Sequence, residues 1–348
     1  MNHRRICAVA SLTGLCVSLA YSSYSLQDKP TITSSSSAVY YQGVYWNNFV
    51  ETQHYMNALA TDDAETDWQT HLLNWNNGKS FRNALILSCG NGFVERTLYD
   101  RGIIQAAVGI DVDLALLEIA RTHADGKYPF KYVLLDSNKN SDFPWGDFDL
   151  VVNHAALHHI AYIDFHVRSL YRLLRRSGGT IVNYDYVGPH RNQYSDDHWN
   201  AIIDLNNRSH PCFRHPDLVY PHLPTMLSVD PSEAIHSELI VETLRRYFEP
   251  QWFRYLNGQL AYALLTHNRN LQHHSCHAKM NISSHVQWVL NEDRLYAEKY
   301  RNDGLFLYSI MTPRIDAPKN ADLDRWSLEE SKRENKARRQ HGLYYGSA

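Results

Sequence analysis

The chain has 348 residues, with 44% hydrophobic and 20% charged residues, which suits a globular protein with one enlarged domain or a domain plus a cap. Its formal net charge of −3 argues against a nucleic-acid-binding surface, which would be strongly basic. The five cysteines are scattered, without a CxxC pair, so we expect neither a disulfide framework nor a zinc site. A reducing compartment fits this cysteine usage best.

The N-terminal segment, residues 1–25, resembles a targeting sequence. Two arginines, Arg4 and Arg5, precede an apolar stretch that runs from Ile6 to about Tyr21. The stretch is short for a membrane span and is interrupted by serines. A signal peptide, an anchor and a start codon assigned too early all fit it. We expect a cytoplasmic protein, either free or weakly membrane-associated through this segment, with a serine-rich linker over 26–38.

Residues 39–80 are rich in aromatic side chains, including Tyr45, Trp46 and Trp68. Their helical character predicts helices that pack on the rest of the domain, and most of these rings are expected in the core. Tyr45 and Trp46 are candidates for the wall of a substrate cleft.

Residues 83–111 predict a βαβ unit. An apolar run, Ala84–Leu87, indicates a buried strand, and the turn Gly90-Asn91-Gly92 follows it. A helical segment and a second apolar run lead to Asp111, about twenty residues beyond the glycines. This order places a close-approach loop beside a carboxylate that can hold a ribose.

The residue at position 95 helps to identify the nucleoside cofactor. A dinucleotide fingerprint has a third glycine there, so that a pyrophosphate can face the helix N-terminus. This chain has Glu95 instead, whose size and charge disfavour a pyrophosphate. S-adenosylmethionine carries no phosphate and requires only close backbone approach.

The next elements bring polar residues to the ends of strands. A helix is expected over Leu114–Ala124 and a third strand over Tyr132–Leu135, which ends at Asp136. A fourth strand, residues 147–153, leads into a loop with three histidines at 154, 158 and 159. In open α/β sheets ligands bind at the carboxyl ends of the strands, so this loop faces the cleft. No carboxylate stands at metal-ligand spacing, and we expect no metal.

Another candidate loop follows the fifth strand. A helix over Asp164–Arg175 precedes a strand over Thr180–Tyr184, and the loop that starts at Asp185 contains acid, phenol, imidazole, guanidinium and amide groups. This mixture suits substrate recognition. Residues 191–249 form an insert that is too long for a passive connection, so we expect a substrate cap. Within it, Asp230 and Pro231 predict the start of a helix that continues to about Arg246.

The last predicted elements complete the sheet. We expect a sixth strand over Gln251–Leu256, helices over Gly258–Leu265 and Ser284–Lys299, and a final strand over Leu305–Met311. The residues from 313 to 348 are polar and predict a solvated tail.

The segments ILSCGNGFVER, VGIDVD, LLDSN, FDLVVNHAALHHI, VNYDYVGPHRNQ and VDPSEAIHS resemble the class I S-adenosylmethionine-dependent methyltransferases. The resemblance implies an α/β Rossmann-like fold over residues 39–312, with a seven-stranded, mostly parallel sheet whose last strand is reversed, helices on both faces and a mainly helical cap insert. It implies cofactor contacts at nine positions: Ser88, Gly90, Asn91, Gly92, Asp111, Val112, Asp136, Ser137 and Asn153. In the family Asn138 often joins the acid that reads adenine. Many members have an acid shortly before the first glycine, where Ser88 and Cys89 stand here, so another residue such as Glu95 would have to contact the methionine amine.

The expected activity is in-line methyl transfer from S-adenosylmethionine to a small molecule or glycan-type acceptor. We expect acceptor handling by His158, Asp185 and His190, because histidine accepts protons near neutrality and carboxylates can orient it. A non-catalytic binding protein with the same fold and an NAD-dependent oxidoreductase are the alternatives.

Overall fold

The computed structural model describes residues 44–139, 143, 146–272, 281–300 and 304–319. Seven strands form one sheet in the order β3-β2-β1-β4-β5-β7-β6. All neighbouring strands are parallel except β7, which is antiparallel to both β5 and β6. The strands are β1 (Ala84–Leu87), β2 (Ala107–Asp111), β3 (Phe130–Leu134), β4 (Leu150–His154), β5 (Thr180–Tyr186), β6 (Phe248–Tyr255) and β7 (Phe306–Pro313). This arrangement confirms the predicted Rossmann-like fold with a reversed last strand.

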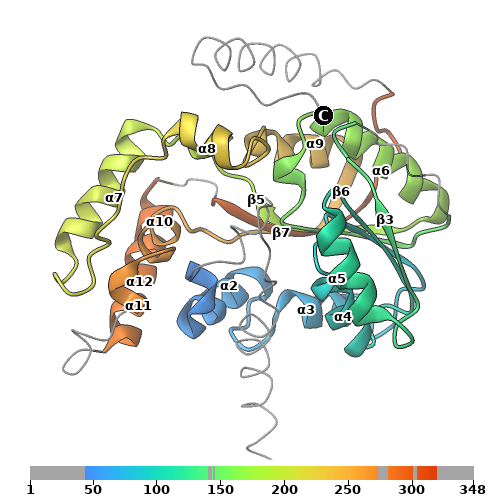
Figure 1. Cartoon of the computed structure of the whole chain (residues 1–348), viewed down its shortest axis with the longest axis horizontal. Helices are drawn as coiled ribbons and strands as arrows, with labels where there is room; N and C mark the ends of the chain where they lie inside the picture. The colour runs from blue at the N-terminus through green and yellow to red at the C-terminus, as the bar shows by residue number, and fades with distance from the viewer. Residues whose placement is uncertain (1–43, 140–142, 144–145, 273–280, 301–303, 320–348) are drawn as a thin grey trace, which may run out of the picture.

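Helices cover both faces of the sheet, and further helices gather to one side of it (Figure 1). The α-helices are α2 (Val50–Thr61), α3 (Trp68–Trp75), α4 (Phe93–Asp100), α5 (Leu114–Ala124), α6 (Ile163–Ser177), α7 (Asp196–Arg208), α8 (Leu223–Val229), α9 (Ile240–Tyr247), α10 (Ala261–Leu265), α11 (Arg269–Gln272) and α12 (Ile282–Tyr300). The short 3-10 helices are η2 (Trp46–Asn48), η3 (Leu157–His159), η4 (His190–Asn192) and η5 (Ser237–Leu239).

Alternation along the strands divides the core into two layers, because successive side chains point to opposite faces. Ile86 and Val152 belong to the layer with α2, α3, α4 and α12. Leu85 and Val151 belong to the layer with α6 and α9. All four side chains are almost completely buried, as expected for parallel strands covered on both faces.

The predicted elements β1 and α5 have the predicted bounds. Two expectations need correction. The fifth strand continues through Asp185 to Tyr186, because β7 pairs with it there. The predicted helix from Pro231 to Arg246 is broken: residues 231–236 form turns, His236 has φ 60°, and regular helix starts at Ile240.

The cysteines also differ from expectation. Cys212 is disulfide-bonded, whereas Cys89 is free and buried. A disulfide is typical of proteins that fold in oxidising compartments, so this bond counts against the reducing compartment expected from cysteine spacing. The targeting-like segment, residues 1–25, lies outside the described residues. Among the helices that the structure does describe, none has both the length and the apolar character needed to cross a bilayer.

Candidate active site

The loop after β1 is a tight glycine turn at the carboxyl edge of the sheet. Gly90 and Gly92 have φ values of 55° and 79°, and Ser88 adopts φ 43°, all in the left-handed region that glycine tolerates best. Gly92 is the N-cap of α4, and a Cβ at this position would lie 2.6 Å from the Tyr132 hydroxyl. The Asn91 side chain accepts from the Phe93 N–H. The two glycines therefore carry no side chain, and the Asn91 side chain bonds to the start of α4, an arrangement that suits close approach by a ligand.

Asp111, at the end of β2, is joined to this loop. Its carboxylate accepts the Gly90 N–H at 2.8 Å through Oδ2 and the Asp113 N–H at 2.8 Å through Oδ1. Each oxygen keeps a second lone pair for a hydroxyl donor. Burial raises the pKa of Asp111, against the N–H donors that lower it. The predicted ribose-binding acid thus lies beside the glycine turn, as the resemblance implies.

The ends of β2 and β3 combine apolar and acidic groups. Val112 follows the buried strand β2 and is 64% exposed, and Leu134, the last residue of the edge strand β3, is 52% exposed. The Asp136 carboxylate accepts the Asn138 N–H and pairs with Lys139 at 3.1 Å. Exposed apolar surface beside an acid fits an adenine ring with an exocyclic amine. Together with Asp111 and the glycine turn, these residues fit S-adenosylmethionine.

Asn138 joins two loops at this edge of the sheet, and its expected contact with adenine stays a prediction. Its side chain donates to the carbonyl of His159 at 3.0 Å and accepts the N–H of Ala161 at 2.7 Å. It therefore ties the loop after β3 to the loop after β4. Ser137 follows Asp136 in the same loop and is half-buried.

Glu95 is completely buried at the start of α4. Neither carboxylate oxygen makes a well-formed hydrogen bond, although the Tyr132 hydroxyl and Arg96 are close enough to influence it. Burial raises the pKa of Glu95 to about 7. The carboxylate lies near the turn but is sealed from solvent, so its assignment to the methionine amine stays a prediction.

His158 and Asp185 form a buried pair at the adjacent ends of β4 and β5. The His158 Nδ1 lies 2.5 Å from Asp185 Oδ1. Burial opposes a charge on His158, but the charges of Asp185, Glu233 and Asp230 and the bond to Asp185 raise its pKa to about 9. The pair brings together two of the three predicted acceptor-handling residues.

Asp185 is held by four donors in all. Besides His158, these are the Asn153 side chain and the backbone N–H groups of Leu157 and Tyr186. Burial disfavours its charge, but His158 and these donors keep the pKa of Asp185 below its usual value. Asn153 also bonds to Asn183 and Leu157, so its side chain supports Asp185 inside the sheet.

The insert supplies a residue that sequence reasoning missed, Glu233. Its Oε2 lies 3.8 Å from His158 Nε2 and 4.0 Å from His159 Nε2, while Ser232 Oγ lies 3.0 Å from His159 Nδ1. The ligand atoms of His158, His159 and Glu233 lie within 4.8 Å of one another, so this donor set has the dimensions of a metal site. The histidine spacing alone did not indicate one, because the carboxylate comes from a distant segment.

His190 lies in a different cluster. Its Nδ1 accepts the backbone N–H of His236 at 3.2 Å and lies 4.0 Å from Glu238 Oε1. His190, His236 and Glu238 form a second donor set of similar dimensions. The role of His190 in acceptor handling stays a prediction.

Four tyrosines lie close enough to Glu233 for its charge to influence their pKa values. Burial raises the pKa of Tyr45 to about 12, and the charge of Glu233 adds to the shift. The pKa values of Tyr186, Tyr194 and Tyr262 also rise, through burial first and with a contribution from Glu233. Aromatic rings with a few polar groups are typical of sites for small molecules. Trp46, by contrast, is buried and stacks on Phe306, which makes it a core residue.

Residues 85–182 match the family described as methyltransferase domain. Among solved structures, the chain is similar to an S-adenosylmethionine-dependent methyltransferase from Mesorhizobium loti, with 15% identity, a TM-score of 0.36, and coverage of 67% of this chain and 91% of that one. It is also similar to a putative methyltransferase from Bacillus halodurans, with 17% identity, a TM-score of 0.37, and coverage of 71% and 96%. No curated protein matches.

Proposed function

We propose that this chain, in which residues 85–182 match a methyltransferase domain, uses S-adenosylmethionine to methylate a hydroxyl oxygen of a small-molecule or glycan acceptor bound against His158. One observation carries the proposal: Asp185 holds one nitrogen of His158 at 2.5 Å, and the other nitrogen faces Glu233 at 3.8 Å. An acceptor hydroxyl placed roughly 2.8 Å from His158 Nε2 could donate its proton to that nitrogen, and a neighbouring hydroxyl of the acceptor could donate to Glu233 Oε2. When bound, S-adenosylmethionine supplies an electrophilic methyl group on a positively charged sulfur.

The residues around this position have different roles in the proposed reaction. Glu233 accepts a hydrogen bond from a second, neighbouring hydroxyl of the acceptor and so orients the molecule. His158 takes the hydroxyl proton at Nε2 as the oxygen–methyl bond forms and the sulfur–methyl bond breaks, and Asp185 stabilises the resulting imidazolium. The rings of Tyr45, Tyr186 and Tyr262 exclude water and offer flat surfaces to an acceptor ring. Binding also holds the methyl donor and the acceptor in position. The entropy lost in bringing them together is lost on binding, so it does not add to the activation barrier of methyl transfer.

The test measures methyl transfer from labelled S-adenosylmethionine to oligosaccharide and phenolic fractions, with mass spectrometry of the products. We expect His158→Asn to lower turnover by about 10²–10⁴-fold, the usual contribution of a general base, and to leave S-adenosylhomocysteine binding unchanged. His222→Asn is the matched control, because His222 is exposed and bonds within its own turn to Thr225. Turnover of His158→Asn within threefold of the unaltered protein would refute the assignment.

Two conditions sharpen this test. Since the pKa of His158 is about 9, a proton already occupies the ring below that pH, and turnover should rise as pH increases toward 9. Dialysis against a chelator should leave turnover unchanged if His158 accepts the proton. Loss of turnover that added divalent metal restores would instead assign the His158, His159 and Glu233 donor set to a metal ion.

A further inference from the structure

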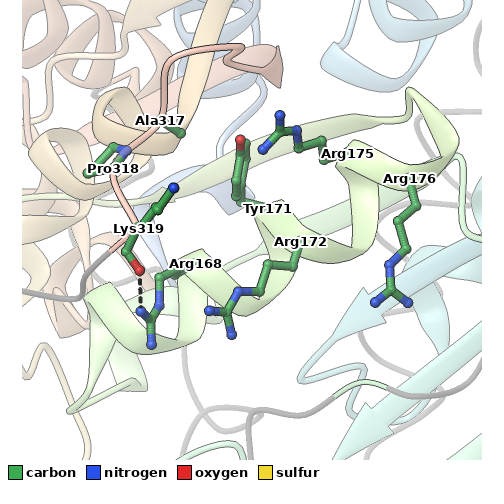
Figure 2. Close-up of a pocket in the computed structure, with 8 residues that line it drawn as sticks. All are labelled: Arg168, Tyr171, Arg172, Arg175, Arg176, Ala317, Pro318 and Lys319. Atoms are coloured by element: carbon green, nitrogen blue, oxygen red, sulfur yellow. Dashed lines mark hydrogen bonds between the residues drawn. The ribbon is translucent and has the colours of Figure 1, made fainter.

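A second polar site lies on α6, outside the residues that surround His158. Four arginines on this helix, Arg168, Arg172, Arg175 and Arg176, line a groove of about 600 Å³ together with Tyr171, Ala317, Pro318 and Lys319. In Figure 2 the guanidinium groups of Arg168 and Arg172 extend in the same direction from the helix, and Arg175 lies by the ring of Tyr171. The groove therefore concentrates positive charge on a chain whose formal net charge is −3.

The spacing of the arginines gathers them on one side of the helix. At about 100° per residue, positions 168, 172, 175 and 176 fall within an arc of roughly 100° and extend over about 12 Å of helix axis. Arg172, Arg175 and Arg176 are exposed, and Arg168 is partly buried. The Arg168 side chain donates to the Lys319 carbonyl, which fixes the far wall of the groove, while its Nε is buried without a hydrogen-bond partner.

These arginines differ from arginines elsewhere on the surface. Arg208 pairs with Asp204 and Glu292, and Arg294 pairs with Glu298. On the segment beside the groove, the Asp316 carboxylate is already bound by Arg314 through two hydrogen bonds. Within the part of the chain that the structure describes, no carboxylate lies at ion-pair distance from any of the four α6 arginines. Their charge is thus left for a ligand.

A simpler explanation covers only part of the cluster. Arg175 and Arg176 lie in the last turn of α6, where cations interact favourably with the helix dipole even without a ligand. Arg168 and Arg172 lie before that turn and gain little from it. These two side chains therefore distinguish a binding site from ordinary helix capping.

We propose that this groove binds a small anion that carries two or more phosphate groups. Guanidinium groups bind phosphate oxygens through paired, charge-assisted hydrogen bonds, and one phosphate is too small to contact arginines spread over about 12 Å. A groove of about 600 Å³ has the size of a small-molecule site. A soluble polyphosphate and a phosphorylated lipid headgroup share this chemistry.

The groove is separate from the catalytic edge. Helix α6 runs from the carboxyl end of β4 to the amino end of β5, and the arginines extend from its middle, at Arg168, to its last turn. A ligand in the groove would therefore bind together with S-adenosylhomocysteine, and its binding does not depend on the proposed acceptor.

The experiment titrates inositol trisphosphate into the full-length protein saturated with S-adenosylhomocysteine, by calorimetry. A parallel titration uses phosphatidylcholine vesicles with and without phosphatidylinositol bisphosphate. We expect saturable binding that Arg168→Gln with Arg172→Gln weakens by at least about tenfold. Binding of the soluble compound assigns a free polyphosphate, and binding restricted to the bisphosphate vesicles assigns a lipid headgroup.

The matched control is Arg208→Gln with Arg294→Gln, which removes the same charge from α7 and α12 and should leave affinity unchanged. Arg172→Gln with Arg176→Gln changes only exposed side chains, so it tests the groove even if the Arg168 variant does not fold. The proposal fails if neither inositol trisphosphate nor the bisphosphate vesicles bind at 1 mM phosphate ligand. It also fails if the control loses as much affinity as the α6 variants.

Discussion

The two ends of the candidate active site each bury a carboxylate, and the fold treats them in opposite ways. Asp185, at the acceptor end, accepts hydrogen bonds from four donors, and His158 and these donors lower its pKa despite burial. Glu95, near the glycine turn, has no well-formed hydrogen bond, and burial raises its pKa to about 7. A buried carboxylate thus stays ionised only where donors replace the lost water.

This difference predicts distinct roles. Asp185 is a fixed negative charge that orients His158 and supports its protonated form. Glu95 is close to half-protonated at neutral pH, and the folded protein loses stability when this carboxyl group ionises. Three measurements test the comparison.

The largest effect is expected at the acceptor end. Asp185→Asn keeps the size of the side chain but removes the charge and one acceptor for the surrounding donors. Turnover should fall by about 10²–10⁴-fold, since the histidine loses its orientation and its charge partner. The pKa of His158, followed by NMR titration, should fall well below about 9, because burial then meets less opposition. A His158 pKa that does not move would contradict the pairing.

A smaller effect concerns Glu95 and stability. A carboxyl pKa of about 7 in the folded state, against an ordinary 4.5, corresponds to about 3 kcal/mol of stability that is present below pH 4.5 and is lost as pH rises through 7. Glu95→Gln removes this titration. The free energy of unfolding, measured with urea from pH 4.5 to 8, should therefore fall for the unaltered protein relative to the variant. A difference between the two proteins that does not change with pH would show that the pKa of Glu95 is not raised.

The smallest of the three effects is expected at Asp111. Asp111→Asn retains one acceptor for Gly90 or Asp113 but removes the charge that holds a hydroxyl. A charge-assisted hydrogen bond contributes about 1.5–3 kcal/mol, so S-adenosylhomocysteine affinity should fall by about tenfold to a hundredfold in calorimetry. Asp113→Asn is the control, because Asp113 caps α5 through Ala115 and Leu116 and should affect stability alone.

The sequence predicted the fold well where local signals coincide. The strand Ala84–Leu87 is apolar and is bounded by a glycine turn, and the helix Leu114–Ala124 has a capping aspartate, so both have the predicted bounds. The extension of β5 was missed because it depends on pairing of Asp185 with Leu307, more than a hundred residues away. The polar side chains in this segment suggested a loop, but pairing with the antiparallel strand β7 keeps the backbone extended.

The site shows the same limit. The cofactor end of the site could be recognised from the sequence, because the acid Asp111 follows Gly90 and Gly92 at a characteristic spacing. Glu233 stands in what looked like the first turn of a helix, where an acid is common for reasons of the dipole. Only the tertiary fold brings it to His158, and only the left-handed turn at His236 shows that the helix does not begin there. A lone acid after Asp230 and Pro231 gave no signal of that contact.

The two bonds of the Asn138 amide, to the carbonyl of His159 and the N–H of Ala161, have a consequence for binding. They tie the loop expected to contact adenine to the loop that carries the histidines. A ligand that orders one loop then also orders the other, so the methyl donor and the acceptor should each raise the affinity for the other by the same factor.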